Sequence, residues 1–166
     1  MNDVDILKKI EKKVLWLACW MIHNANHIRE NQEGLKVGGH QASSASIVSI
    51  MTALYFNILR PEERVAVKPH ASPVFHAIQY LSGLQTKEKI ENFRGFGGAQ
   101  SYPSRTKDID DVDISTGSVG LGVAMTSFIS LIQDYVSRKK FYKNKPLGRM
   151  IALVGDAELD EGNVYE

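Results

Sequence analysis

Apolar positions in the first third of the chain recur every three or four residues, which is the spacing of an amphipathic helix. The pattern covers Ile6–Ile28 and predicts one long helix that begins at an Asp3 cap and ends before Gly34. A second helical pattern covers Ile47–Ile58 and ends before a proline. The first part of the chain is therefore predicted to be helical.

Two short segments have a different pattern. The stretch Arg64–Lys68 predicts a strand that is broken by a proline-containing loop, and Met150–Val154 is an unbroken apolar run of the kind found in parallel strands covered on both faces. Helical patterns between them end at Gly83, begin again at Thr86, and return over 119–137. Strands separated by helices long enough to cross over predict an α/β fold with a parallel sheet flanked by helices.

Composition narrows the class of protein without naming it. The 166 residues are 43% hydrophobic and 23% charged, and 20 basic against 19 acidic side chains leave a net charge of +1. This balance gives no large field that would attract nucleic acid or an anionic membrane. The apolar run Leu15–Ile22 is too short to span a bilayer, and the single cysteine, Cys19, cannot form an internal disulfide. We therefore expect a cytoplasmic protein.

Two polar residues directly follow the predicted strands. His70 comes after the first strand and Asp156 after the second. Ligands bind outside the carboxyl ends of parallel strands, so both side chains are predicted to lie at one edge of the sheet. A rigidly held aspartate there offers a hard oxygen to a Mg²⁺ ion that also binds a diphosphate. A solvated acidic loop or helix start is the alternative for the Asp156 segment.

The segment from Ser115 to Gly122 places glycines and hydroxyls at the start of a helix, where exposed N–H groups favour a phosphate. A glycine-rich turn that lets the helix pack closely is the alternative. His40 and His70 lie in loops beside small residues, which makes them better candidates for catalysis than core histidines. The four carboxylates of Asp108–Asp113 are expected to form a solvated loop.

Four blocks occur in the order found in a known family. The chain resembles the thiamine-diphosphate domain of transketolases and of the homodimeric pyruvate dehydrogenase E1 component in Gly38-Gly39-His40, His70-Ala71-Ser72-Pro73, Gly117-Ser118-Val119-Gly120-Leu121-Gly122 and Gly155-Asp156-Ala157-Glu158. The resemblance implies an incomplete thiamine-diphosphate-binding fold. It divides the chain into an N-terminal helical segment, 1–36, and a diphosphate- and Mg²⁺-binding domain, 37–166, truncated at its carboxyl-terminal end.

The resemblance also implies a role for individual residues. Asp156 would be the Mg²⁺ ligand, and His40, His70 and Tyr102 would be catalytic, facing the thiazolium and the substrate. Contacts with thiamine diphosphate would come from His70, Gly117, Ser118, Val119, Asp156 and Ala157. The implied cofactors are thus thiamine diphosphate and Mg²⁺.

The implied activity is carbon–carbon bond cleavage and two-carbon transfer on a 2-oxo acid or a ketose. The Ser101-Tyr102-Pro103 segment looks more like the pyruvate dehydrogenase E1 component than like transketolase. The chain stops before the family's second metal ligand and activating glutamate, so we expect it to need its remaining domains or a partner chain, to form a homodimer, and to be inactive alone. A non-catalytic fragment or assembly subunit, and an unrelated α/β phosphate-binding domain, are the alternatives.

Overall fold

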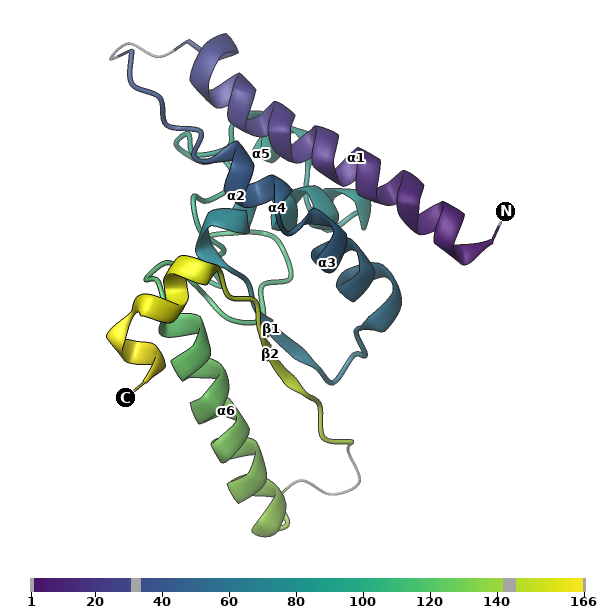
Figure 1. The fold of residues 1–166 in the computed structure, drawn as a ribbon, viewed down its shortest axis with the longest axis vertical. Helices are drawn as coiled ribbons and strands as arrows, with labels where there is room; N and C mark the ends of the chain where they lie inside the picture. The colour runs from purple at the N-terminus through teal and green to yellow at the C-terminus, as the bar shows by residue number, and fades with distance from the viewer. Residues whose placement is uncertain (1, 31–33, 142–145, 166) are drawn as a thin grey trace.

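The computed structural model describes residues 2–30, 34–141 and 146–165. The predicted N-terminal helix is confirmed as α1 (Asp3–His23), which continues as a π-helical turn (Asn24–Ile28) and crosses the top of Figure 1. Its cap differs from the expectation. Asn2 accepts a hydrogen bond from the Asp5 backbone N–H at 2.9 Å, because Asp3 is already the first helical residue.

The second helical region is broken into short pieces. It consists of α2 (Gln41–Ala45), α3 (Val48–Ala53) and a π-helical turn (Leu54–Ile58). Together with α4 (Ser72–Leu81), α2 and α3 pack against α1. The core between them contains the fully buried side chains of Val14, Met21, Met51, Val74 and Phe75. Burial of each such side chain stabilises the fold by about 1.5–3 kcal/mol.

The described residues form one parallel sheet of two strands. β1 (Arg64–Ala66) pairs with β2 (Met150–Ala152) in a register that sets Val65 opposite Ile151. The predicted parallel pairing is confirmed, but both strands are shorter than expected. The prediction that β2 is covered on both faces is wrong, because its residues are only half-buried: among the described residues, β1 is its one strand neighbour.

Helices lie on both sides of this pair. In Figure 1 the strands run between α6 (Leu121–Arg138) on one side and α3 and α4 on the other. The predicted start of a helix at Thr86 is confirmed by the short helix α5 (Lys87–Glu91), which Thr86 caps. After β2 the chain forms two 3-10 turns, η4 (Asp156–Asp160) and η5 (Gly162–Val164), and η5 packs against α6.

The predicted division of the chain at residues 36 and 37 stays a prediction. Side chains of α1 share their hydrophobic core with α3 and α4, so the first helix is part of the same packed unit as the strands. None of the helices within the described residues is long and apolar enough to cross a membrane.

Candidate active site

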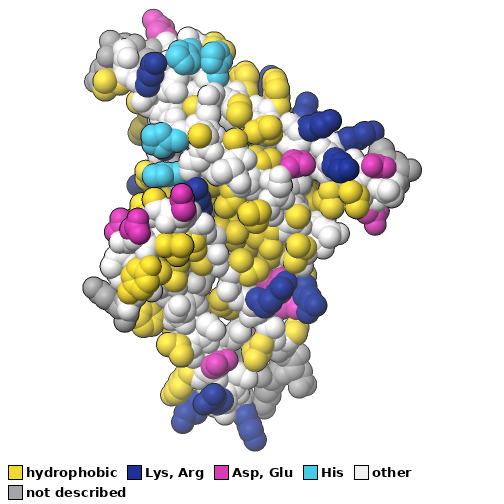
Figure 2. Space-filling model, in the orientation of Figure 1, with side chains coloured by type: hydrophobic (Ala, Val, Ile, Leu, Met, Phe, Trp, Pro, Cys, Tyr) yellow, Lys and Arg dark blue, Asp and Glu magenta, His cyan; other side chains and the backbone are white. Residues whose placement is uncertain are grey.

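The carboxyl ends of β1 and β2 open into one cleft. β1 leads through Lys68 into a 3-10 turn (Pro69–Ala71), and β2 leads through Gly155 into η4. The cleft between them is lined by Ser43, Lys68, Pro69, His70, Val119, Gly155, Asp156, Ala157, Glu158 and Glu161. The prediction that His70 and Asp156 lie at the same edge of one sheet is thus confirmed. Figure 2 shows histidine, basic and acidic side chains gathered on this side of the molecule.

Three aromatic rings lie side by side next to this cleft. The rings of His40 and His70 are 5.5 Å apart between centroids and meet edge to face, and the ring of Tyr102 lies 6.2 Å from that of His70. The three residues expected to be catalytic come from segments far apart in the sequence, and the structure brings them together. His40 is exposed, whereas His70 and Tyr102 are partly buried.

The His70 imidazole is in a setting that favours its neutral form. Partial burial, followed by the positive charges of His40 and Lys68, lowers the pKa of His70 below its ordinary value. A neutral imidazole at pH 7 has one nitrogen that can accept a proton and one that can donate. His70 is therefore suited to proton transfer at neutral pH.

Arg94 holds the loop that carries His40 against the rings. Its guanidinium donates to the Val37 carbonyl at 2.8 Å, lies 5.8 Å from the centroid of the Tyr102 ring, and touches the position that a Cβ on Gly39 would occupy. Gly39 also has a φ of +89°, a conformation that favours glycine. No pattern in the sequence indicated this function of Arg94.

The predicted phosphate segment lies at the start of α6. Val119 lines the cleft, and Gly117 packs against the ring of Tyr102, which a Cβ at this position would approach to 3.6 Å. Ser118 is exposed. Gly120 has a φ of +82° and precedes Leu121 without a side-chain cap. The segment thus reaches the same cleft as Asp156.

Glu158 joins the two loops that border the cleft. Its buried carboxylate accepts hydrogen bonds from the backbone N–H groups of Gly155 at 2.7 Å and Gly120 at 3.5 Å. It thereby fixes the loop after β2 against the start of α6. The sequence signal was present in the spacing, because a glutamate three residues after a helix-capping position often bonds back to that position.

Asp156 and its neighbour have the exposure that binding requires. Asp156 and Ala157 are both exposed at the cleft. Within the residues that the structure describes, the Asp156 carboxylate has no hydrogen bond and no ion pair. It follows that both of its oxygens are available to a cation.

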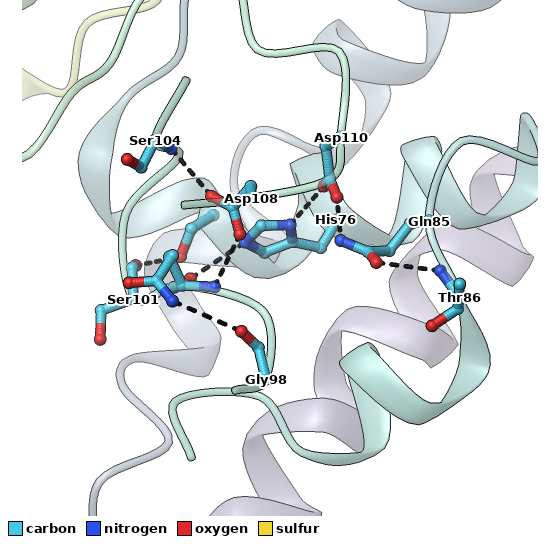
Figure 3. Close-up of polar contacts among 10 residues, drawn as sticks. His76, Gln85, Thr86, Gly98, Ser101, Ser104, Asp108 and Asp110 are labelled. Carbon is cyan, nitrogen blue, oxygen red and sulfur yellow. Dashed lines mark hydrogen bonds and ion pairs between the residues drawn. The ribbon is translucent and has the colours of Figure 1, made fainter. Parts of the chain in front are cut away.

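The acidic run 108–113 is not the solvated loop that the sequence predicted. Asp110 is buried, and its carboxylate binds Nδ1 of His76 at 2.6 Å and accepts a hydrogen bond from the Gln85 side chain (Figure 3). Asp113 is partly buried and accepts from the Val65 N–H at 2.9 Å, and burial raises its pKa. The prediction failed because the buried partners are distant in the sequence.

His76, Asp108 and Asp110 offer three ligand atoms within 4.8 Å of one another, the arrangement of a metal site. Their hydrogen bonds argue otherwise. Nε2 of His76 faces the Gln100 carbonyl at 3.0 Å, and a carbonyl only accepts, so this nitrogen carries a hydrogen. Asp108 accepts from the backbone N–H groups of Gln100 at 3.0 Å and Ser104 at 2.8 Å. This cluster holds the loop between α5 and α6 in place (Figure 3).

The chain is similar to known proteins along nearly its whole length. No family model matches the chain. Over 96% of its length the chain is 26% identical to the pyruvate dehydrogenase E1 component of Mycolicibacterium smegmatis, 25% to that of Escherichia coli K12 and 29% to that of Pseudomonas aeruginosa. It spans about 18% of the length of each of these relatives.

These similarities indicate the class of protein to which the chain is related. The expected resemblance to thiamine-diphosphate enzymes of the pyruvate dehydrogenase E1 type is confirmed. The chain is related, along nearly its whole length, to one segment of the pyruvate dehydrogenase E1 component.

Proposed function

We propose that this chain forms the part of a thiamine-diphosphate-dependent enzyme that holds the diphosphate and its Mg²⁺ ion, and that the enzyme acts on a 2-oxo acid. The observation that carries the proposal is the exposed carboxylate of Asp156, which has no partner among the described residues and shares a cleft with His70 and Val119. A hard divalent cation beside a diphosphate needs such an oxygen ligand.

The residues of the cleft fit this group. Asp156 would hold the Mg²⁺ ion, and the backbone of Ala157 and of the segment Gly117–Val119 would border the diphosphate. These segments reach the same cleft in the structure, because Val119 and Ala157 both line it. Thiamine diphosphate, when bound, supplies the electron sink for cleaving a bond next to a carbonyl.

The rings beside the cleft would handle protons and orient the substrate. His70, whose pKa is lowered by burial and by neighbouring positive charge, can accept a proton at neutral pH. His40, exposed and in edge contact with His70, can donate to an oxygen of the substrate. Tyr102 packs against His70 and limits the orientations of its ring.

The substrate class follows the names of the relatives. Pyruvate, or another 2-oxo acid, is the substrate that we propose, and two-carbon transfer from a ketose by a transketolase-type reaction is the second candidate. Activity would need further domains or a partner chain, with a homodimer as the expected assembly. An unrelated phosphate-binding domain would keep Asp156 and the Gly117 segment but have no preference for thiamine.

A role as an assembly subunit is supported by one surface. Helix α6 exposes large apolar side chains along its length: Phe128, Leu131, Ile132 and Tyr135, each about 60% exposed. Surfaces of this kind mark sites of contact with other protein. The proposed enzyme and this assembly role are compatible, because a cofactor-holding part would bury such a helix against the rest of the enzyme.

Cofactor binding by the 166-residue chain tests the proposal. Titrating a ¹⁵N-labelled chain with thiamine diphosphate and Mg²⁺ should reveal weak binding that shifts the amide signals of Gly155, Asp156 and Val119, whereas thiamine without its diphosphate should not. Asp156→Asn should weaken binding at least about tenfold, the loss typical even of an outer-shell partner of a metal, and excess Mg²⁺ should recover part of it. Binding that is equal in Asp156→Asn and the parent would refute the metal role.

A further inference from the structure

Lys68 lines the same cleft, and its position is fixed by its neighbours. It follows β1 and precedes Pro69, and both Val67 and Pro69 are buried. A residue before proline is confined to extended conformations, and Lys68 has φ −47° and ψ 125°. The start of the Lys68 side chain is therefore held at the carboxyl end of β1.

The Lys68 side chain crosses the backbone of Gly155. A Cβ on Gly155 would lie 2.8 Å from Cε of Lys68 and 3.1 Å from Nζ, so the end of the lysine side chain lies directly against the Gly155 backbone and a larger residue there would displace it. The backbone hydrogen bond from Leu153 N–H to the Ala66 carbonyl, at 2.9 Å, holds the two strand ends together just before this contact. The ammonium group is thus placed next to the loop that carries Asp156.

The ammonium group of Lys68 is available to a ligand. Within residues 2–30, 34–141 and 146–165, Nζ of Lys68 makes no hydrogen bond and no ion pair, although Lys68 is partly buried. Glu158 is occupied by the N–H groups of Gly155 and Gly120. A partly desolvated ammonium without a partner favours the binding of an anion.

The charged side chains that line the cleft determine whether an anion can bind there. Asp156, Glu158 and Glu161 line the cleft, so a diphosphate would be repelled unless cations offset these carboxylates. A divalent cation at Asp156 offsets part of that charge, and Lys68 is the lysine that lines the same cleft. Lysine binds phosphate as a point charge that needs no fixed geometry.

We propose that Lys68 is an anion-binding residue of this cleft, whose ammonium group binds a phosphate oxygen of a diphosphate lying across Gly155 while the divalent cation is held at Asp156. The proposal rests on the proposed function for the identity of the cation site. The charge of Lys68 also acts on the neighbouring His70, whose pKa it helps to lower. A carboxylate of a substrate is the other oxyanion that an ammonium group here would take.

Inorganic pyrophosphate, titrated into the 166-residue chain with Mg²⁺ and followed by calorimetry, tests this residue separately from thiamine. Lys68→Met should weaken pyrophosphate binding about tenfold or more, because a hydrogen bond to a charged group is lost. Lys68→Arg should restore most of the affinity. Lys87→Met, at an exposed lysine of α5, is the matched control and should bind as the parent does.

Each outcome supports or overturns the assignment. Equal pyrophosphate affinity in Lys68→Met and the parent, or no pyrophosphate binding by the parent at all, overturns it. Pyruvate binding that depends on Lys68 while pyrophosphate binding does not would assign the ammonium to a carboxylate and overturn the diphosphate assignment. Pyrophosphate binding that depends on Lys68, with no gain in affinity for thiamine diphosphate, would support Lys68 and overturn the proposed function.

Discussion

Two clusters of histidine and carboxylate side chains lie in this small protein, and they differ in what their polar atoms bind. In the first, His76 and Asp110 are buried, and Gln85, Gln100 and Ser104 supply hydrogen-bond partners to the cluster. In the cleft, the second cluster, Asp156 and Lys68 have no partner among the described residues. The candidate metal-ligand atoms lie close together in the buried cluster, but they already bind protein groups. In the cleft, the charged groups of Asp156 and Lys68 are available to a ligand.

The comparison shows that spacing alone does not identify a binding site. Three ligand atoms within 4.8 Å suggest a metal, but a cation at His76 would have to replace hydrogen bonds that already satisfy both ring nitrogens. A buried polar cluster whose groups are all satisfied makes the fold rigid. Polar groups that the fold leaves unsatisfied at a cleft are the ones that bind ligands.

Removal of His76 should have the largest effect on stability. His76→Ala leaves the buried carboxylate of Asp110 without its closest partner and also creates a cavity beside Phe75 and Phe93, whose rings contact His76. Loss of one partner from a buried pair costs about 3–5 kcal/mol of the free energy of unfolding. Urea denaturation followed by circular dichroism measures this change.

The matched control for that experiment is His27→Ala. His27 is an exposed histidine at the end of the first helix, and its change should stay within about 0.5 kcal/mol of the parent. Equal stability of His76→Ala and His27→Ala would show that the buried cluster does not stabilise the loop. In that case, contacts outside the His76 cluster would hold this loop in place.

A smaller effect is expected for His70 and should appear only as a dependence on pH. Because the folded-state pKa of His70 is lowered, the unfolded chain takes up a proton at this position more readily than the folded chain. The stability contributed by neutral His70 is therefore fully present above the ordinary value of about 6.5 and is lost as the pH falls from there through the folded pKa. His70→Gln should flatten this part of the profile.

Unfolding midpoints measured between pH 8 and pH 5 in parallel for the parent and His70→Gln provide the test. His23→Gln, which replaces an exposed histidine of α1, is the control for the loss of a histidine side chain. A parent whose stability rises as the pH falls through this window would contradict the lowered pKa of His70.

The sequence predicted the cleft better than it predicted the buried cluster, for a physical reason. His70 and Asp156 each lie in the turn that follows a strand, and parallel pairing alone brings the two strand ends to the same edge. His76 and Asp110 are 34 positions apart and meet only because a long loop without helix or strand folds back onto α4. No local spacing encodes that return, so the acidic run was misread as solvated.

Two smaller errors have similar causes. Asn2 caps the first helix in place of Asp3, since a shift of one residue decides which side chain reaches the first free N–H. β2 is half-buried because β1 is its one strand neighbour among the described residues. An apolar run in the sequence does not indicate how many strands will pair with it. Local patterns thus predicted which elements form, and the tertiary neighbours decided how far they extend and how deeply they are buried.

The central claim is that the divalent cation binds at Asp156 in the cleft and not at the buried cluster of His76. Mn²⁺ in small excess, added to the ¹⁵N-labelled chain, broadens amide signals near its binding site and so reports the position directly. The account predicts broadening of the signals of Gly155, Asp156 and Val119, which Asp156→Asn abolishes and Asp108→Asn leaves intact. Broadening centred on His76 and Asp110, abolished by Asp108→Asn and unaffected by Asp156→Asn, would contradict it.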